Sequence, residues 1–175
     1  LLLLGQYSFA QVREVIRLDG GQWFRVLATD EVQRSSNGTS YQTVGNLQDV
    51  LPANRGTVST SLWGSKYLGA TIYYRETYQH NGREITKYLG ALQGKNWKEV
   101  PENTKYGVAY GQASVGNKNN AFGYWMIRRE DGMVMYSVTG VSFQETGAKA
   151  LIHEHKRDLP LSPNNLFAHD GHLIV

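Results

Sequence analysis

The stretch AFGYWMIRREDGMVMYSVTGVSF, residues 121–143, decides the fold class of this chain. It contains two runs rich in aromatic and β-branched residues, separated by the dipeptide Asp131-Gly132. Asp-Gly readily adopts the left-handed dihedral angles of a two-residue type I′ turn, so the stretch predicts a β-hairpin. A turn of two residues would place Trp125 opposite Val138. Because neither side of this ribbon is uniformly polar, we expect it to lie centrally in a sheet with both faces mostly covered.

A second hairpin is predicted at Asn81-Gly82, another dipeptide typical of two-residue turns. Pairing across this turn sorts the flanking residues into two faces. The predicted core face carries Ile72, Tyr74, Tyr78, Ile85 and Leu89, and it also places Glu76 opposite Lys87, where the two are expected to form an ion pair. The predicted solvent face carries Tyr73, Arg75, Thr77, Gln79, Glu84, Thr86 and Tyr88.

The composition also indicates an all-β chain. Nineteen glycines, eleven tyrosines and only four prolines are typical of short strands and tight turns, and no segment keeps a helical period. We therefore predict an antiparallel β-sandwich of jelly-roll type, with a closed β-barrel as the alternative. Because no segment reads as a linker, residues 11–175 are expected to form a single domain. Further strands are expected at residues 12–18, 22–28, 41–44, 57–63 and 106–115.

The N-terminal segment resembles the end of a secretory signal peptide. Leu1–Leu4 begin an apolar run, and Ser8-Phe9-Ala10 places small residues at the −3 and −1 positions before Gln11. Residues 1–10 are therefore expected to be a signal-peptide remnant or, alternatively, a first strand. The first of these readings predicts a secreted or extracytoplasmic protein.

Charge and cysteine content bound the kinds of site the chain can carry. Eighteen basic and fifteen acidic residues give a formal charge of +3, and the basic residues are scattered instead of forming a stripe. Nucleic acid is therefore not an expected partner, and no membrane span is expected either. The chain has no cysteine, which excludes thiolate metal sites and cysteine nucleophiles. The G-x-S-x-G, H-E-x-x-H and G-x-G-x-x-G motifs are absent as well, so we expect a non-catalytic protein without a cofactor.

The histidines suggest one alternative to a non-catalytic protein. Four of the five lie near the C-terminus, at His153, His155, His169 and His172. On a strand, His153 and His155 would point the same way, as two imidazoles that bind one metal ion must. Gly147 followed by this pair resembles the first half of a cupin metal motif, although Leu159 and Pro160 stand where that family has a glutamate. A metal-dependent enzyme with a divalent ion at this histidine cluster is therefore an alternative hypothesis.

A second alternative comes from an early tryptophan and a late arginine. Gly21-x-Trp23 together with Arg128 or Arg129 resembles the lipocalin pattern, in which the arginine crosses the tryptophan at the closed end of the barrel. That resemblance implies a barrel that carries a small apolar ligand in an enclosed cavity. The expected lining includes Trp23, Trp125 and Tyr136.

The predicted solvent face of the second hairpin favours a binding function. A flat ring stacks on a sugar while neighbouring polar groups bind the hydroxyls, and protein-binding surfaces have a similar composition. We therefore expect a recognition, adhesion or structural assembly domain of an exported or particle-associated protein, whose partners are glycans or proteins. The candidate ligand-binding residues are Tyr73, Arg75, Tyr88 and Trp97, the last on a polar connection at residues 94–104. The apolar end of the chain, residues 172–175, predicts edge pairing in a homo-oligomer.

Overall fold

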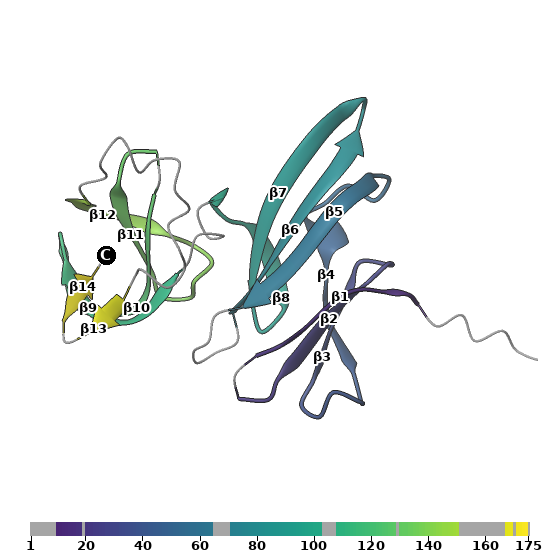
Figure 1. The fold of residues 1–175 in the computed structure, drawn as a ribbon, viewed down its shortest axis with the longest axis horizontal. Coiled ribbons are helices and arrows are strands. Elements are labelled where there is room, and N and C mark those ends of the chain that lie inside the picture. Colours follow the sequence, from purple (N-terminus) through teal and green to yellow (C-terminus); the bar gives the residue numbers. More distant parts are fainter. Residues whose placement is uncertain are drawn as a thin grey trace, which may run out of the picture.

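The computed structural model describes residues 10–18, 20–64, 71–102, 108–128, 130–150, 167–169 and 171–174. It consists almost entirely of antiparallel strands, which confirms the predicted all-β fold (Figure 1). The elements are β1 (Val12–Arg17), β2 (Trp23–Leu27), β3 (Glu31–Ser35), β4 (Gln42–Asn46), the short 3-10 helix η1 (Leu47–Asp49), β5 (Gly56–Gly64), β6 (Thr71–His80), β7 (Arg83–Leu92), β8 (Lys95–Glu99), β9 (Ala109–Val115), β10 (Lys118–Ile127), β11 (Met133–Ser137), β12 (Gln144–Lys149), β13 (Phe167–His169) and β14 (His172–Ile174).

The first eight strands form two four-stranded sheets that pack as a sandwich. Their strand orders are β1-β2-β3-β4 and β5-β6-β7-β8. Strand β1 contacts β5 and β4 contacts β8, so the two sheets meet along both sides. Alternate residues of each strand point inward and form the main core. Its buried members are Leu18, Phe24, Val26, Val32, Leu47, Leu51, Leu62, Ile72, Tyr74, Tyr78, Leu89, Ala91 and Trp97.

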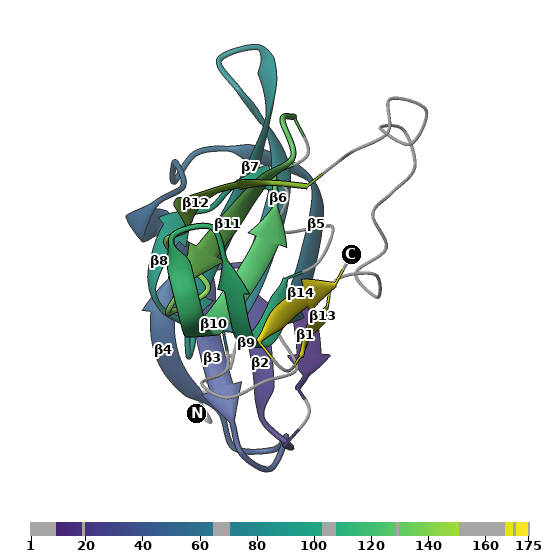
Figure 2. The ribbon, with the colours of Figure 1, turned by 90° about the vertical axis from the view of Figure 1, so that its left-hand side faces the viewer.

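The C-terminal strands form a third sheet with its own core. Its order is β12-β11-β10-β9, and the hairpin β13–β14 lies beside β9 (Figure 2). The Ser114 amide of β9 donates to the Gly171 carbonyl at 2.6 Å. Trp125 is completely buried in this core, and its indole N–H donates to the Gly111 carbonyl at 3.1 Å. The remaining buried members of this core are Ala109, Ala113, Ile127 and Val134.

A third, smaller cluster joins the sandwich to the C-terminal sheet. Tyr73, Val100 and Val141 are its buried members. The Tyr73 hydroxyl donates to the Gly140 carbonyl at 2.8 Å, and both groups are buried. Figure 1 shows the two parts as neighbouring lobes that meet at one end of β6, β7 and β8. That residues 11–175 form a single domain stays a prediction.

The hairpin at Asn81-Gly82 has the predicted register. Tyr74 lies opposite Leu89 and Glu76 lies opposite Lys87 in the backbone pairing. Asn81 and Gly82 have φ angles of 51° and 73°, the left-handed values that a type I′ turn requires at both positions. The predicted core face is buried except for the partly buried Ile85.

The hairpin around Asp131 exists, but its register differs from the predicted one by two residues. Trp125 lies opposite Tyr136 instead of Val138. The ladder ends where the Arg128 amide donates to the Met133 carbonyl at 2.8 Å, so the turn is longer than two residues. Asp131 causes this difference, because its carboxylate accepts from the Met133 amide at 3.1 Å and closes the wider loop. A shift of two residues leaves every side chain on its predicted face.

The predicted antiparallel sandwich is confirmed, but its strand order is not that of a jelly roll. Within the described residues, each strand of a sheet pairs with its neighbour in the chain, which is a meander and not the Greek-key order of a jelly roll. None of these sheets closes into a barrel. Of the two arginines in the lipocalin-like pattern, Arg128 binds Asp131 and does not cross Trp23, whose ring centroid has Arg17 at 5.6 Å instead; Arg129 lies outside the described residues. Trp23 lies on β2, outside the buried core clusters, whereas Trp125 is buried in the core of the C-terminal sheet, so the two do not line one cavity.

Candidate functional site

Two of the four predicted ligand-binding residues are buried, which corrects their placement on a surface. Tyr73 is 1% exposed and stacks on Trp63 at a centroid distance of 5.7 Å. Trp97 is 4% exposed and packs in the sandwich core, with its ring edge toward Tyr74 at 6.5 Å. The residues around Trp97 form strand β8 and not a polar connection, and the strand directs its tryptophan inward. Neither side chain can contact a ligand on the outside of the protein.

The other two predicted residues are partly buried on the same outer face of β6 and β7. Arg75 donates to the Ser59 hydroxyl at 3.3 Å, and the Tyr88 hydroxyl donates to the Glu102 carboxylate at 3.4 Å. Toward the turn at residues 81–82, this face contacts solvent as predicted. Toward the opposite end, the C-terminal sheet covers it at Tyr73. The predicted recognition face is therefore divided into a solvated half and a covered half.

The predicted histidine cluster is only partly described. His153 and His155 lie outside the described residues. His172 is exposed on β14, and its backbone pairs with that of His169 on β13. Among the described residues, no group of three or more histidine, cysteine, aspartate or glutamate side chains could hold a metal ion.

A groove lies where the outer face of β7 and β8 meets the C-terminal sheet. Its volume is about 610 Å³, within the range of ligand-binding pockets. One wall comes from the β7–β8 hairpin, and the other comes from β10, β11 and the loop that leads to β12. The lining residues are Leu92, Gln93, Lys95, Asn96, Lys98, Lys118, Tyr136, Ser137, Val138, Thr139, Val141, Ser142 and Gln144.

A β-bulge in β8 places two lysines on the same side of the strand. In a regular strand, residues three positions apart point to opposite faces. Here Leu92 lies opposite Lys95 while Gly90 lies opposite Lys98, so β8 holds one extra residue between the two pairs. Asn96 adopts the left-handed conformation in this segment, with a φ of 55°. Lys95 and Lys98 therefore both line the groove.

The opposite wall supplies a third lysine and an aromatic ring. Lys118 is the first residue of β10, and its ammonium lies 5.6 Å from the centroid of the Tyr136 ring. The Tyr136 hydroxyl donates to the Phe122 carbonyl at 3.0 Å, which fixes the ring along this wall. Gly123 leaves room for the ring, because a Cβ atom there would lie 2.8 Å from a ring carbon.

The lining of the groove carries positive charge without a compensating acid. It contains three lysines and no aspartate or glutamate. The carboxylate of Glu99, next to Lys98, binds Lys87 at 2.8 Å, and that of Glu145, next to Gln144, binds Arg128 at 2.8 Å. Within the described part of the chain, no ion pair involves a lysine of the groove. The groove is therefore suited to a ligand with negative charge.

The loop between β11 and β12 is held in place by hydrogen bonds. The Ser137 hydroxyl accepts from the Gly140 amide at 2.9 Å. The Thr139 carbonyl accepts from the Thr71 hydroxyl of the sandwich at 2.9 Å. These contacts fix the loop to both parts of the molecule, so the groove wall is preformed.

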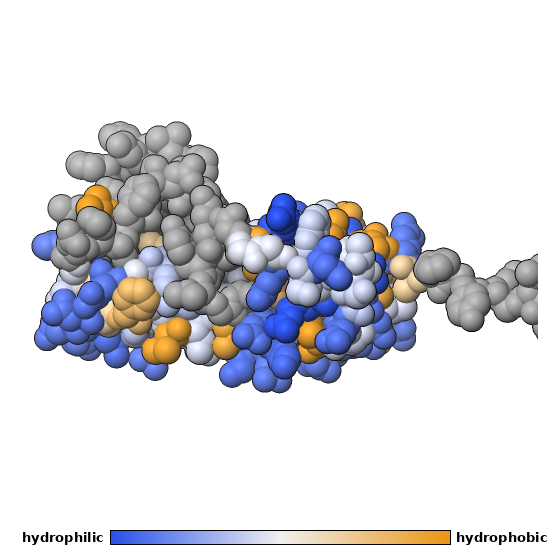
Figure 3. Space-filling view, turned by 90° about the horizontal axis from the view of Figure 1, so that it is seen from below, coloured by the Kyte–Doolittle hydropathy of each residue, from blue (hydrophilic) through white to orange (hydrophobic). Residues whose placement is uncertain are grey.

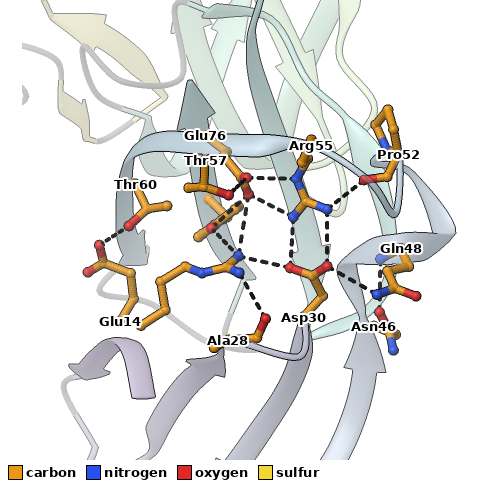
Figure 4. A network of polar contacts seen from close by, with 12 residues as sticks. Glu14, Ala28, Asp30, Asn46, Gln48, Pro52, Arg55, Thr57, Thr60 and Glu76 are labelled. Atoms are coloured by element: carbon orange, nitrogen blue, oxygen red, sulfur yellow. Dashed lines mark hydrogen bonds and ion pairs between the residues drawn. The ribbon is translucent and has the colours of Figure 1, made fainter. Parts of the chain in front are cut away.

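The second notable polar feature is a buried network of ion pairs in the sandwich (Figure 4). The Arg55 guanidinium donates to both oxygens of Glu76, at 2.7 and 2.9 Å, and to both oxygens of Asp30, at 2.7 and 3.0 Å. Arg13 adds a bond to Asp30 at 2.8 Å. Glu76 also accepts from the Thr57 hydroxyl at 2.6 Å. Two carboxylates and two guanidiniums thus neutralise one another.

This network replaces the predicted ion pair between Glu76 and Lys87. Lys87 binds Glu99 instead, because the Glu76 carboxylate points into the core, where it is completely buried. Burial is the largest single effect and raises the pKa of each carboxyl group. The hydrogen bonds and positive charges around it, those of Arg55 first, together outweigh burial and hold the pKa values of Glu76 and Asp30 below their usual range. Every carboxylate oxygen in the network accepts at least two hydrogen bonds. These acids therefore stabilise the fold and are not available for acid–base catalysis.

Sequence reasoning missed the groove because its residues are far apart in the chain. Lys95 and Lys98 fell in a predicted connection, and Lys118 belonged to none of the predicted strands. The glycine of Gln93-Gly94 was a usable signal for a turn. In the structure both residues have positive φ angles, 54° and 75°, and they close the β7–β8 hairpin. The bulge at Asn96 left no comparable signal.

The groove is the feature from which a function can be argued. Among the described residues, no helix is long and apolar enough to cross a membrane. Comparisons of the chain with models of protein families, with curated proteins and with solved structures gave no match.

Proposed function

We propose that this protein is a non-catalytic recognition domain that binds an acidic partner in the groove between its sandwich and its C-terminal sheet. The observation that carries the proposal is the lining itself, with three lysines, no carboxylate and a preformed wall. A ligand with negative groups would provide the charge that this lining lacks.

The chemistry of the lining supports binding and not catalysis. Its residues include no histidine, aspartate or glutamate that could act as a general base near neutral pH. Over the coloured part of the face in Figure 3, hydrophobic residues form small separate patches among hydrophilic ones, so the described residues there present no extended apolar surface. A secreted or extracytoplasmic location, which the N-terminal sequence suggests, is part of the proposal.

Charge reversal in the groove tests the proposal. The variant Lys95→Glu/Lys98→Glu should abolish binding of chondroitin sulfate and of poly-L-glutamate in isothermal titration calorimetry. The matched control, Arg83→Glu/Lys149→Glu, changes the net charge equally at exposed positions outside the groove lining. Arg83 lies at the far end of β7, about 30 Å from Leu92 at ~3.3 Å per residue.

The control variant should retain binding to within about twofold, because Arg83 lies well beyond the screening length and Lys149 is outside the groove lining. If neither polyanion binds the unmodified protein, or if both variants lose binding to the same degree, the proposal is wrong.

A further inference from the structure

We infer that the acidic partner is a glycan chain that carries carboxylate or sulfate groups. This inference rests on the proposed function, because it names the class of ligand for the same groove. Its basis is the set of uncharged side chains that accompany the three lysines.

The groove presents amide and hydroxyl groups whose side chains have no partner in the described part of the chain. Asn96, Ser142 and Gln144 are exposed at the groove and form no side-chain hydrogen bond there. An amide and a hydroxyl each offer both a donor and an acceptor. Sugar hydroxyls are also both donors and acceptors, and every unit of a glycan chain carries several. An acidic peptide offers carboxylates and main-chain groups but few hydroxyls.

Apolar surface accompanies these polar groups. Leu92 is 39% exposed and Val138 is 71% exposed, and both line the groove together with the Tyr136 ring. The C–H face of a pyranose packs on apolar surface of this kind while its hydroxyls are bound at the edges. The groove thus offers three kinds of contact, and an acidic sugar unit can use all three.

The type of cation also argues against phosphate-rich partners. The lining contains lysines but no arginine. Arginine is over-represented where a phosphate is bound by two parallel hydrogen bonds, as in phosphopeptide and nucleic-acid sites. Single-stranded nucleic acids also require several exposed rings for stacking, and the lining provides only Tyr136.

The positions of the lysines fit a chain that crosses the groove. Lys95 and Lys98 lie on the β8 wall, and Lys118 lies on the opposite wall. Asn96 lies between the first two, on the backbone that the bulge distorts. Acidic groups on successive sugars would contact the lysines of the two walls, and Asn96 would bind a hydroxyl at the β8 wall. Asn96 is therefore the residue we assign to sugar specificity.

The test compares ligands of different chemistry by calorimetry. The probes are oligogalacturonate, which carries carboxylates only, chondroitin sulfate oligosaccharide, neutral cello-oligosaccharide and poly-L-glutamate. At least one acidic glycan should bind about tenfold more tightly than poly-L-glutamate and than the neutral glycan. A plot of log affinity against log salt should have a slope of about −2 to −3. By analogy with nucleic acids, where each neutralised phosphate releases ~0.7–0.9 counterions, each of the three lysines should contribute about that amount to the slope. Comparing the two acidic glycans shows whether carboxylate or sulfate is preferred.

Two variants separate glycan recognition from charge alone. Asn96→Gly removes the amide but keeps the positive φ angle, and Gln144→Ala changes an exposed residue, so both should fold. Each should weaken binding of the acidic glycan about fivefold, the loss expected for one hydrogen bond, and leave poly-L-glutamate binding unchanged. Poly-L-glutamate binding as tightly as the glycans, or glycan affinity unaltered in both variants, would overturn the inference while the proposed function stands. Absence of binding to every polyanion would overturn both.

Discussion

The buried network around Arg55 allows a quantitative prediction for the variant Glu76→Gln. The Glu76 side chain is fully buried and that of Arg55 is 2% exposed, so the pair has no access to solvent screening. Glutamine keeps the size of the side chain but removes its charge. Asp30 alone would then face the two guanidiniums of Arg55 and Arg13. One positive charge would remain uncompensated inside the sandwich.

The expected cost follows from this burial. Removing one partner of a buried ion pair typically destabilises a protein by about 3–5 kcal/mol, a large part of a total stability of about 5–15 kcal/mol. The exposed pair of Lys87 and Glu99 provides the control, because the Glu99 side chain is 58% exposed. Glu99→Gln should cost only about 0–1 kcal/mol, since solvent screens such pairs.

Urea unfolding followed by tryptophan fluorescence measures both effects. The midpoint should fall strongly for Glu76→Gln and hardly for Glu99→Gln, with unchanged slopes for both variants. A loss below about 1 kcal/mol for Glu76→Gln, or equal losses for the two variants, would refute the assigned role of the network.

Three further predictions concern stability. The folded-state pKa values of Asp30 and Glu76 lie below their unfolded values of 3.8 and 4.5. The stability that these two carboxylates contribute to the fold should therefore be complete above about pH 5 and should be lost as the pH falls through the lower folded-state values. Urea midpoints between pH 7 and pH 2 measure this loss. Gly82→Ala should cost about 1–2 kcal/mol in the same unfolding assay, because Gly82 has a φ of 73°. Tyr73→Phe should cost about 1–2 kcal/mol, because the change leaves a buried main-chain carbonyl without its donor at the contact between the sandwich and the C-terminal sheet.

Each of these predictions has a result that would contradict it. If the urea midpoint does not change from pH 7 to pH 2, or if it falls equally in Glu76→Gln, the network is not the cause of acid unfolding. For Gly82→Ala, stability equal to that of Gly56→Ala would be contrary evidence, since Gly56 has no positive φ and a Cβ there meets only ordinary contacts. Unaltered stability in Tyr73→Phe would show that the hydrogen bond to Gly140 does not help to join the two parts.

The two predicted hairpins show which features of this fold can be inferred from the sequence. Asn81 and Gly82 both adopt positive φ angles, so the turn and the register follow from these two residues alone. At Asp131 the side chain accepts a main-chain hydrogen bond and widens the loop, which the dipeptide does not reveal. The alternation of apolar residues was sufficient for the faces in both cases, because a shift of two residues preserves them.

The candidate site depends on contacts that local patterns do not contain. Tyr73 was assigned to solvent because strand alternation identifies an outer face but not the distant segment that covers it. Val141, far along the chain, is part of that cover. The groove requires the bulge at Asn96 and the approach of Lys118 from another sheet, and neither is visible in the spacing of residues. Glu76 was assigned to its cross-strand neighbour because Arg55 lies in a loop before β5.

The most direct test of the central claim is to locate an acidic ligand on the protein by NMR. In a titration of ¹⁵N-labelled protein with chondroitin sulfate oligosaccharide, the largest amide shift changes should occur at the groove, for example at Asn96, Lys98 and Ser142. Amides at the distant turn of residues 81–82 should not move. Shift changes centred outside the groove, or spread evenly over the lysines of the surface, would contradict the claim that this groove binds the acidic partner.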